Sequence, residues 1–231
     1  GRFPGVPVIF HMNADMDAEV RRIRAHPAMV AARALVGDYV TATMRPEFAD
    51  GVYDPLYAAA EEVGLPIFNS THGGCGNMAV IAKRHPDLTL IIDHIGVAQH
   101  PSSPPEAMSW APFEDLLELA QYPNVHVKLC GAPLLSQENY PYEDVWPYLD
   151  RLFAAFGHER VMWGSDYTRL RSLGGERPRR RGITYAESLN HLLHSDRLTH
   201  EQKALVLGGN ARRLFNLPAL SQDWGPPPMF W

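Results

Sequence analysis

The chain has 231 residues, of which 45% are hydrophobic and 20% are charged. This length accommodates one large domain, and the hydrophobic share excludes an intrinsically disordered protein. There is no apolar run of the roughly 18 residues that a membrane-spanning helix needs, and a net charge of −5 argues against a nucleic-acid-binding protein. Two cysteines are too few for a disulfide framework, so we expect a cytoplasmic protein.

Short apolar runs alternate along the chain with amphipathic segments, a pattern typical of alternating strands and helices. The predicted strands, in chain order, are 5–10, 30–36, 66–72, 89–94, 125–130 and 160–166. The predicted helices are 15–26, 54–63 ended by Gly64, 77–84, 112–121, one around 146–153 closed by Gly157, and 185–194. A last helix begins with a capping box from Thr199 to Gln202 and ends at Gly208-Gly209, before a helical turn at 210–215.

Strict alternation of strands and helices predicts a parallel sheet with helices outside it. The strand at 125–130 distinguishes two arrangements, because it alternates Val125, Val127 and Leu129 with polar residues such as His126 and Lys128. A doubly wound sheet buries both faces under apolar helices, whereas a barrel tolerates polar residues near its mouth. We therefore predict one α/β barrel domain over 1–231, with a Pro-rich C-terminal tail at 217–231.

Three predicted strands end in residues that bind metal ions or move protons. His72 ends the predicted strand at 66–72, His94 ends the strand at 89–94, and Asp166 ends the strand at 160–166. Ligands of parallel α/β folds lie beyond the carboxyl ends of the strands, so we expect these side chains to converge. Imidazole and carboxylate are the usual ligands of a catalytic zinc ion. For any one of the three, a strand-end cap or a buried core residue is the alternative.

The order and spacing of several motifs resemble the late strands of the amidohydrolase-related family. That family includes aminocarboxymuconate semialdehyde decarboxylase, resorcylate decarboxylases and several lactonases. The motifs are His72-Gly73-Gly74, Asp93-His94-Ile95-Gly96, Val127-Lys128-Leu129, Trp163-Gly164-Ser165-Asp166 and the segment 208–215.

The resemblance implies a TIM-type (β/α)8 barrel that binds a divalent metal, with zinc as the expected ion. By position it implies His72 and Asp166 as metal ligands, Asp166 also as proton acceptor, and His94 as the residue that assists catalysis. Some family members function without a metal, so a metal-free site stays open.

The chain departs from the family pattern at one point. The family's first barrel strand ends in His-x-His, which supplies two metal ligands, and this sequence contains no His-x-His. Its six predicted strands correspond to strands three to eight, so we expect a longer natural chain. Because catalytic zinc usually has three protein ligands, metal binding by His72 and Asp166 alone is an open question.

Cationic residues near the predicted barrel mouth are candidates for substrate binding. Arg169 lies three residues beyond Asp166, and Lys128 is predicted to face the barrel interior. We expect both to bind the acidic group of a small anionic substrate. For Lys128, an ion pair with a buried acidic residue is the alternative. Residues 177–181 include four arginines, and for this segment a solvated loop is the plainer interpretation.

A glycine motif offers a different interpretation. Residues 74–79 match G-x-G-x-x-A between a predicted strand and helix, and Asp93 follows Gly76 by seventeen positions, as in a dinucleotide-binding fingerprint. The polar residues 70–72 separate the strand from the glycines, which disfavours this interpretation. We expect the glycines to let the backbone approach a ligand beside His72. The histidines at helix and loop positions, including His85 and His191, are expected at the surface.

The sequence therefore predicts a metal-dependent hydrolase acting on a small carboxylate, lactone or ester. Non-oxidative decarboxylation of an unsaturated or aromatic acid is the second reaction the resemblance implies. A non-catalytic fragment or pseudoenzyme that serves as a binding partner is the alternative of another class. Self-association as a homo-oligomer is left open, and we expect neither a nucleic-acid partner nor a membrane.

Overall fold

The computed structural model of the protein describes residues 4–9, 12, 15–99, 103, 108–167 and 183–218. The strands are β1 (Val8–Ile9), β2 (Ala32–Ala34), β3 (Gly37–Asp38), β4 (Thr43–Met44), β5 (Ile67–Asn69), β6 (Leu90–Ile92), β7 (Val125–Leu129) and β8 (Val161–Trp163). The α-helices are α1 (Met16–Ala25), α2 (Pro46–Ala49), α3 (Asp54–Val63), α4 (Met78–Arg84), α5 (Phe113–Glu118), α6 (Trp146–Phe156), α8 (Tyr185–Leu193), α9 (His200–Ala204) and α10 (Asn210–Leu214). None of the helices within these residues is long and apolar enough to cross a bilayer.

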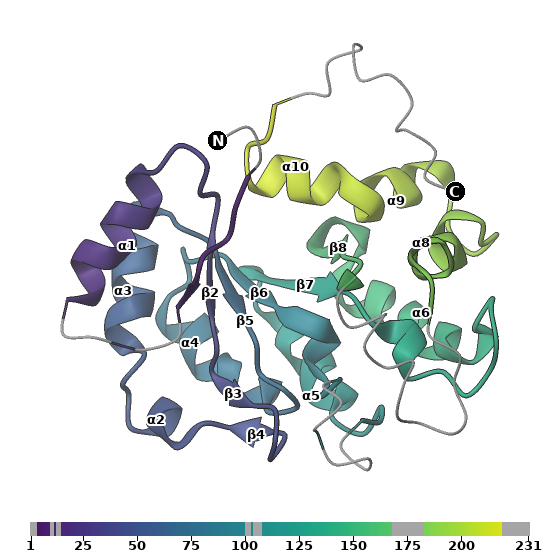
Figure 1. Ribbon diagram of the computed structural model, residues 1–231, viewed down its shortest axis with the longest axis horizontal. Coiled ribbons are helices and arrows are strands. Elements are labelled where there is room, and N and C mark those ends of the chain that lie inside the picture. Colours follow the sequence, from purple (N-terminus) through teal and green to yellow (C-terminus); the bar gives the residue numbers. More distant parts are fainter. Residues whose placement is uncertain are drawn as a thin grey trace.

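Six of the strands form one parallel sheet, in the order β1-β2-β5-β6-β7-β8. Neighbours in this sheet follow one another in the chain, as in a barrel, apart from the hairpin β3–β4 between β2 and β5. Within the described residues, β1 and β8 are the outer strands of the sheet. Figure 1 shows α1 and α3 side by side on one side of the sheet, away from α9 and α10. The predicted parallel sheet of six strands is thus confirmed.

The two faces of the sheet differ in what covers them. On the outer face, side chains such as Val127 and Leu129 of β7 join the large core formed with the helices. On the inner face a smaller apolar cluster gathers Phe68, Ile91 and Met162 with residues of α10. His126 and Lys128, the alternate residues of β7, are only partly buried, as the alternation in the sequence predicts. A large outer core and a partly polar interior are the layers of an α/β barrel.

Element boundaries and caps test the sequence analysis more closely. Helix α3 spans 54–63 as predicted, and Gly64 ends it with a left-handed φ of 62°. The capping box of Thr199 is present at the start of α9. The strands β5, β6 and β8 are shorter than predicted and stop before His72, His94 and Asp166, which lie in the turns that follow. The hairpin β3–β4 and the short helix α2 were not predicted.

The predicted break of the last helix at Gly208-Gly209 is present. Helix α9 leads into a π-helical turn, 205–209, in which Gly208 has a non-helical φ of 169°, and α10 begins at Asn210. Asn210 fixes this junction, because its buried side-chain amide donates hydrogen bonds to the carbonyls of His158 and Val161 at 2.6 and 2.8 Å. The bonds hold α10 against β8. Of the predicted tail at 217–231, only residues 217 and 218 lie within the described part of the chain.

Two histidines expected at the surface are buried. His85 is 7% exposed, and its Nδ1 lies 2.7 Å from Glu61 Oε2. His191 is 3% exposed on α8, beside the ring of Tyr142. His194, three residues further on, is exposed, so the two do not share an environment. A lone histidine on an apolar helix face is therefore a core residue here.

Burial lowers the pKa of His191 to about 4, whereas an unfolded chain titrates at its ordinary value of roughly 6.5. Between these values the unfolded state binds a proton that the folded state does not, so the free energy of unfolding decreases as the pH falls through this window. We expect His191→Leu to flatten the decline of the Tm from about pH 6.5 to about pH 4, and His194→Leu to leave it unchanged. Equal slopes for all three proteins would contradict the assignment.

Candidate functional site

The residues that follow three of the strands share an unusual backbone conformation. His72 after β5, His94 after β6 and Asp166 after β8 have φ values of 51°, 55° and 45°. Residues other than glycine rarely adopt this left-handed backbone conformation, which costs about 1–3 kcal/mol of conformational strain per residue. Such strain concentrates at functional sites. The three positions singled out in the sequence are thus sharp turns at one edge of the sheet.

Two of these residues form a close acid–base pair. His94 Nε2 lies 3.3 Å from Asp166 Oδ2, and the side chains are 4% and 16% exposed. Cys130, directly after β7, joins them: one donor atom each from His94, Cys130 and Asp166 lie within 4.8 Å of one another. Cys130 was not predicted as a site residue, because it lies in no recognisable Cys/His nucleophile motif of the sequence. Its alternation with Lys128 along the strand was the available signal, since both residues lie on the interior face.

The thiol and the imidazole affect each other's protonation. Burial alone would raise the pKa of Cys130, but the neighbouring charges of His94 and Lys128 outweigh it and lower that pKa. Burial alone would lower the pKa of His94, but Cys130 and Asp166 outweigh it and raise that pKa. For the other thiol, Cys75, burial and the charge of Asp115 outweigh a backbone hydrogen bond and raise the pKa to about 12. The Cys130 thiol therefore loses its proton more readily than the Cys75 thiol.

A buried glutamine holds the ends of β6 and β7 together. Gln99 Nε2 donates hydrogen bonds to the carbonyl of His94 at 3.2 Å and to the carbonyl of Cys130 at 3.0 Å. Gly131 leaves room for it, because a Cβ there would lie 1.9 Å from Gln99 Oε1. Gly131 also has a φ of 72°, which suits glycine. Gln99 thus fixes the spacing between His94 and Cys130.

His72 lies beside this cluster. Its Nε2 is 3.0 Å from the hydroxyl of Ser70, and its ring stacks on that of His94 with centroids 6.3 Å apart. The ring of Tyr39, from the β3–β4 hairpin, makes an edge-to-face contact with the His72 ring, with the ring centroids 6.1 Å apart. The structure therefore brings His72 to the same edge of the sheet as His94 and Asp166. Its role as a metal ligand stays a prediction.

Lys128 belongs to an ion network next to the site. Both oxygens of the fully buried Asp93 are bound: Oδ2 by Arg33 Nε at 2.6 Å and Oδ1 by Lys128 Nζ at 3.1 Å. Burial alone would raise the pKa of Asp93, but Lys128, His94 and Arg33 outweigh it and hold that pKa below its ordinary value. Arg33 was not singled out in the sequence, because nothing in its strand marked it as a partner of Asp93.

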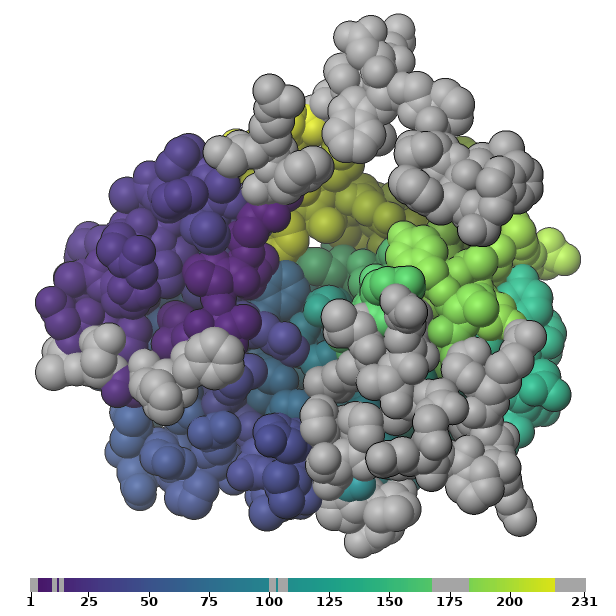
Figure 2. All heavy atoms as spheres, in the orientation of Figure 1, coloured from purple at the N-terminus to yellow at the C-terminus, as the bar shows by residue number. Residues whose placement is uncertain are grey.

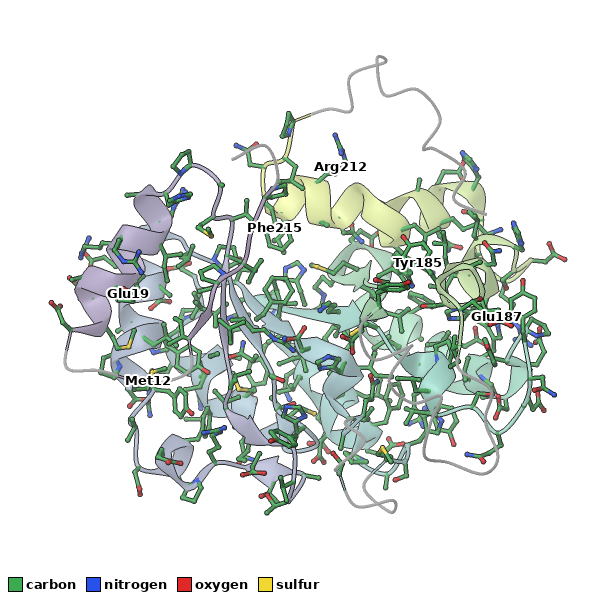
Figure 3. All side chains as sticks on the ribbon, viewed as in Figure 1. Met12, Glu19, Tyr185, Glu187, Arg212 and Phe215 are labelled. Atoms are coloured by element: carbon green, nitrogen blue, oxygen red, sulfur yellow. The ribbon has the colours of Figure 1, made fainter. Side chains whose placement is uncertain are left out.

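A cavity of about 350 Å³ adjoins this network on the inner face of the sheet. Arg33, Asp93 and Lys128 line it together with apolar side chains of β1, β5, β8 and α10. Figure 2 shows the surface hollowed between the purple strand β1 and the yellow helix α10. Phe215, directly after α10, points toward the sheet and packs on Phe68, whereas Arg212 points away from it (Figure 3). Arg169, the other predicted substrate ligand, lies outside the described residues.

The glycine motif at 74–79 has a packing explanation. A Cβ on Gly74 would lie 2.5 Å from Met44 Cγ, and one on Gly76 would lie 3.3 Å from Asp115 Cβ. The glycines admit neighbouring elements of the protein, and the approach of the backbone to a ligand beside His72 stays a prediction. Both carboxylate oxygens of Asp93 bind cationic side chains, Arg33 and Lys128. Asp93 therefore cannot bind the ribose hydroxyl, as the acidic residue of a dinucleotide fingerprint does.

Comparison with known proteins gives a consistent assignment. Residues 4–217 match the family model described as Amidohydrolase. The chain is 32% identical over 150 residues to L-fucono-1,5-lactonase of Burkholderia ambifaria, covering 63% of this chain and 48% of that protein. It is 31% identical over 137 residues to 4-sulfomuconolactone hydrolase of Hydrogenophaga intermedia, covering 58% and 42%. The chain thus spans about half the length of the curated relatives it matches.

Among solved structures, the chain is similar to an amidohydrolase from Burkholderia multivorans that contains bound zinc. The sequence identity is 21% and the TM-score 0.73, with 94% of this chain and 75% of that chain covered. At this identity the likeness shows the fold, and it confirms the predicted TIM-type α/β architecture.

The Asp93 network generates a stability prediction. Asp93→Asn keeps the shape of the side chain but leaves Arg33 and Lys128 without their counter-ion. We expect the free energy of unfolding in urea to fall by about 3 kcal/mol. Asp54→Asn is the matched control, because Asp54 pairs with Arg84 at 2.6 Å with both side chains about half exposed, and its loss costs about 1 kcal/mol or less. Equal losses in the two variants would contradict a structural role of the network.

Proposed function

This chain belongs to the amidohydrolase family. On that premise we propose that the carboxyl ends of its parallel strands form the active site of a hydrolase that opens small lactones. The names of two relatives, a fuconolactonase and a sulfomuconolactone hydrolase, support a lactone as the substrate class. The single observation that carries the proposal is the pair of Asp166 and His94, 3.3 Å apart, in which His94 is buried and the Asp166 side chain is 16% exposed.

In the proposed reaction Asp166 accepts the proton of the water that attacks the lactone carbonyl. A carboxylate can act as a general base only where it is held in reach of that water. The left-handed turn at Asp166 and the adjacent His94 fix its position. The partial exposure of Asp166 lets water reach it, whereas the burial of His94 keeps the imidazole in one orientation.

A divalent metal fits the donors present at this edge. Imidazole nitrogen, thiolate and carboxylate are all ligands of zinc, and His94, Cys130 and Asp166 offer one each in close proximity. His72 and Asp166 are the ligands that the resemblance implies. When bound, zinc lowers the pKa of a water ligand to about 7 and polarises a carbonyl. His94 has two possible roles, as hydrogen-bond donor to the substrate carbonyl or as a metal ligand.

We propose a substrate with an anionic group. Arg33 and Lys128 together carry one positive charge more than Asp93 neutralises, and all three line the cavity on the inner face. A cavity of about 350 Å³ with apolar walls and a few charged groups suits a small organic acid. Lys128 acts through this excess charge, since one of its N–H groups is already bound by Asp93. Arg169 stays a prediction.

Decarboxylation stays the second reaction, since it would use the same donors. A non-catalytic role in binding is disfavoured by the convergence of an acid–base pair and a buried thiol, because binding alone does not require strained turns at His94 and Asp166.

Asp166→Asn tests the proposed base directly. The amide keeps the size of the side chain but cannot accept a proton, so we expect kcat/KM for L-fucono-1,5-lactone or another confirmed lactone to fall on the order of 10²–10⁴-fold. The Tm should change little, because Asp166 is partly exposed. Asp87→Asn, an exposed carboxylate ahead of β6, is the control and should keep full activity. A loss below about tenfold in Asp166→Asn with an unchanged Tm would remove Asp166 from the mechanism.

A further inference from the structure

We infer that Cys130, His94 and Asp166 together bind a thiophilic divalent cation such as zinc, with Cys130 as a sulfur ligand. The inference deepens the proposed function, on which it rests for the presence of a cation at the strand-end edge. The resemblance of the sequence points to His72 and Asp166 instead, so the two assignments differ in testable ways.

The geometry of the three donors is close to that of a zinc site. With zinc–ligand bonds of about 2.0–2.3 Å, ligand atoms of a tetrahedral site lie roughly 3.3–3.8 Å apart. In the protein the three donor atoms lie within 4.8 Å of one another, and Asp166 and His94 approach to 3.3 Å. The largest separation therefore exceeds the tetrahedral range by no more than about 1 Å.

The number and kind of donors also fit. Catalytic zinc sites use three protein ligands and leave one position open for water. His94, Cys130 and Asp166 supply nitrogen, sulfur and oxygen from three different strand ends. His94 and Cys130 are almost fully buried, whereas Asp166 is 16% exposed, so the open position faces solvent beside the carboxylate. This is the side from which water and substrate reach the ion.

His72 is less well placed for this ion than His94. Its Nε2 lies 3.0 Å from the hydroxyl of Ser70, and its ring is inclined by 24° to that of His94, with the centroids 6.3 Å apart. The groups of donor atoms that come within 4.8 Å of one another in the described residues include His94 and not His72. Of the two roles open to His94, the geometry points to the metal ligand.

The supporting residues serve the same arrangement. Gln99 ties the backbone of His94 to that of Cys130, which sets the distance between the nitrogen and sulfur donors. Gly164 lets Cys130 and Lys128 pack closely against β8, because a Cβ there would lie 2.8 Å from Lys128 Cε and 3.7 Å from Cys130 Cβ. In known metal sites, mutating a residue that orients a ligand in this way lowers the affinity for the metal by about 10–100-fold.

Cobalt(II) provides the test, because it replaces zinc and its thiolate bonds give an intense sulfur-to-metal charge-transfer band in the near ultraviolet. The chain contains only two cysteines. In the Cys75→Ser variant, Cys130 is the one remaining cysteine, so any charge-transfer band must come from Cys130. We expect this variant and the unaltered chain to show the same band. Cys130→Ser should lose the band and bind zinc at least about 10–100-fold more weakly in a competition titration.

Two histidine variants separate the competing ligand sets. We expect His94→Ala to weaken cobalt binding by at least about 10–100-fold, and His72→Ala to keep the charge-transfer band with less than about a tenfold loss of affinity. Circular dichroism of each variant checks that it is folded. If Cys130→Ser does not fold, the band in Cys75→Ser still decides the question.

Absence of the band in both the unaltered chain and Cys75→Ser would overturn the inference. So would a band that persists in Cys130→Ser, or cobalt binding that is lost in His72→Ala but kept in His94→Ala. Lactone hydrolysis is assayed separately on the same preparations. A chain that shows the band and opens no lactone would contradict the proposed function and leave the metal ligands assigned.

Discussion

The six strands of the large sheet run in one direction, and they lie in the sheet in the order in which they occur in the chain. This constraint brings all the strand ends to one edge, so that His72 and Asp166 reach the same neighbourhood although 94 residues separate them. The interior is organised around the same edge. Asp93, at the end of β6, binds Arg33 of β2 and Lys128 of β7. Gln99 links the backbone at the ends of β6 and β7. The donors of the site therefore depend on backbone positions that the sheet sets.

Much of the fold and part of the site follow from local pattern. The alternation along β7 predicted which face is polar, and the glycine at position 64 and the threonine at position 199 marked helix ends that the structure has. His72, His94 and Asp166 were found because each follows an apolar run, and parallel topology then places such residues at one edge. These inferences need only the residue itself and its immediate neighbours.

The features that were missed depend on partners far away in the chain. Cys130 becomes a site residue only through the register of β7 with its neighbours, which sets it beside His94 and Asp166. The burial of His191 depends on what packs over α8, and Gly74 is small because Met44 of the unpredicted hairpin lies against it. Strands of two residues, such as β3 and β4, carry too little pattern to be recognised.

Anomalous diffraction at the zinc absorption edge, from crystals of the chain grown with zinc, tests the proposed ligands most directly. We expect one strong anomalous peak at the carboxyl ends of β6, β7 and β8, within about 2.0–2.3 Å of donor atoms of His94, Cys130 and Asp166. A peak bound by His72 without Cys130, a peak elsewhere on the protein, or no peak at saturating zinc would contradict the assignment of these ligands.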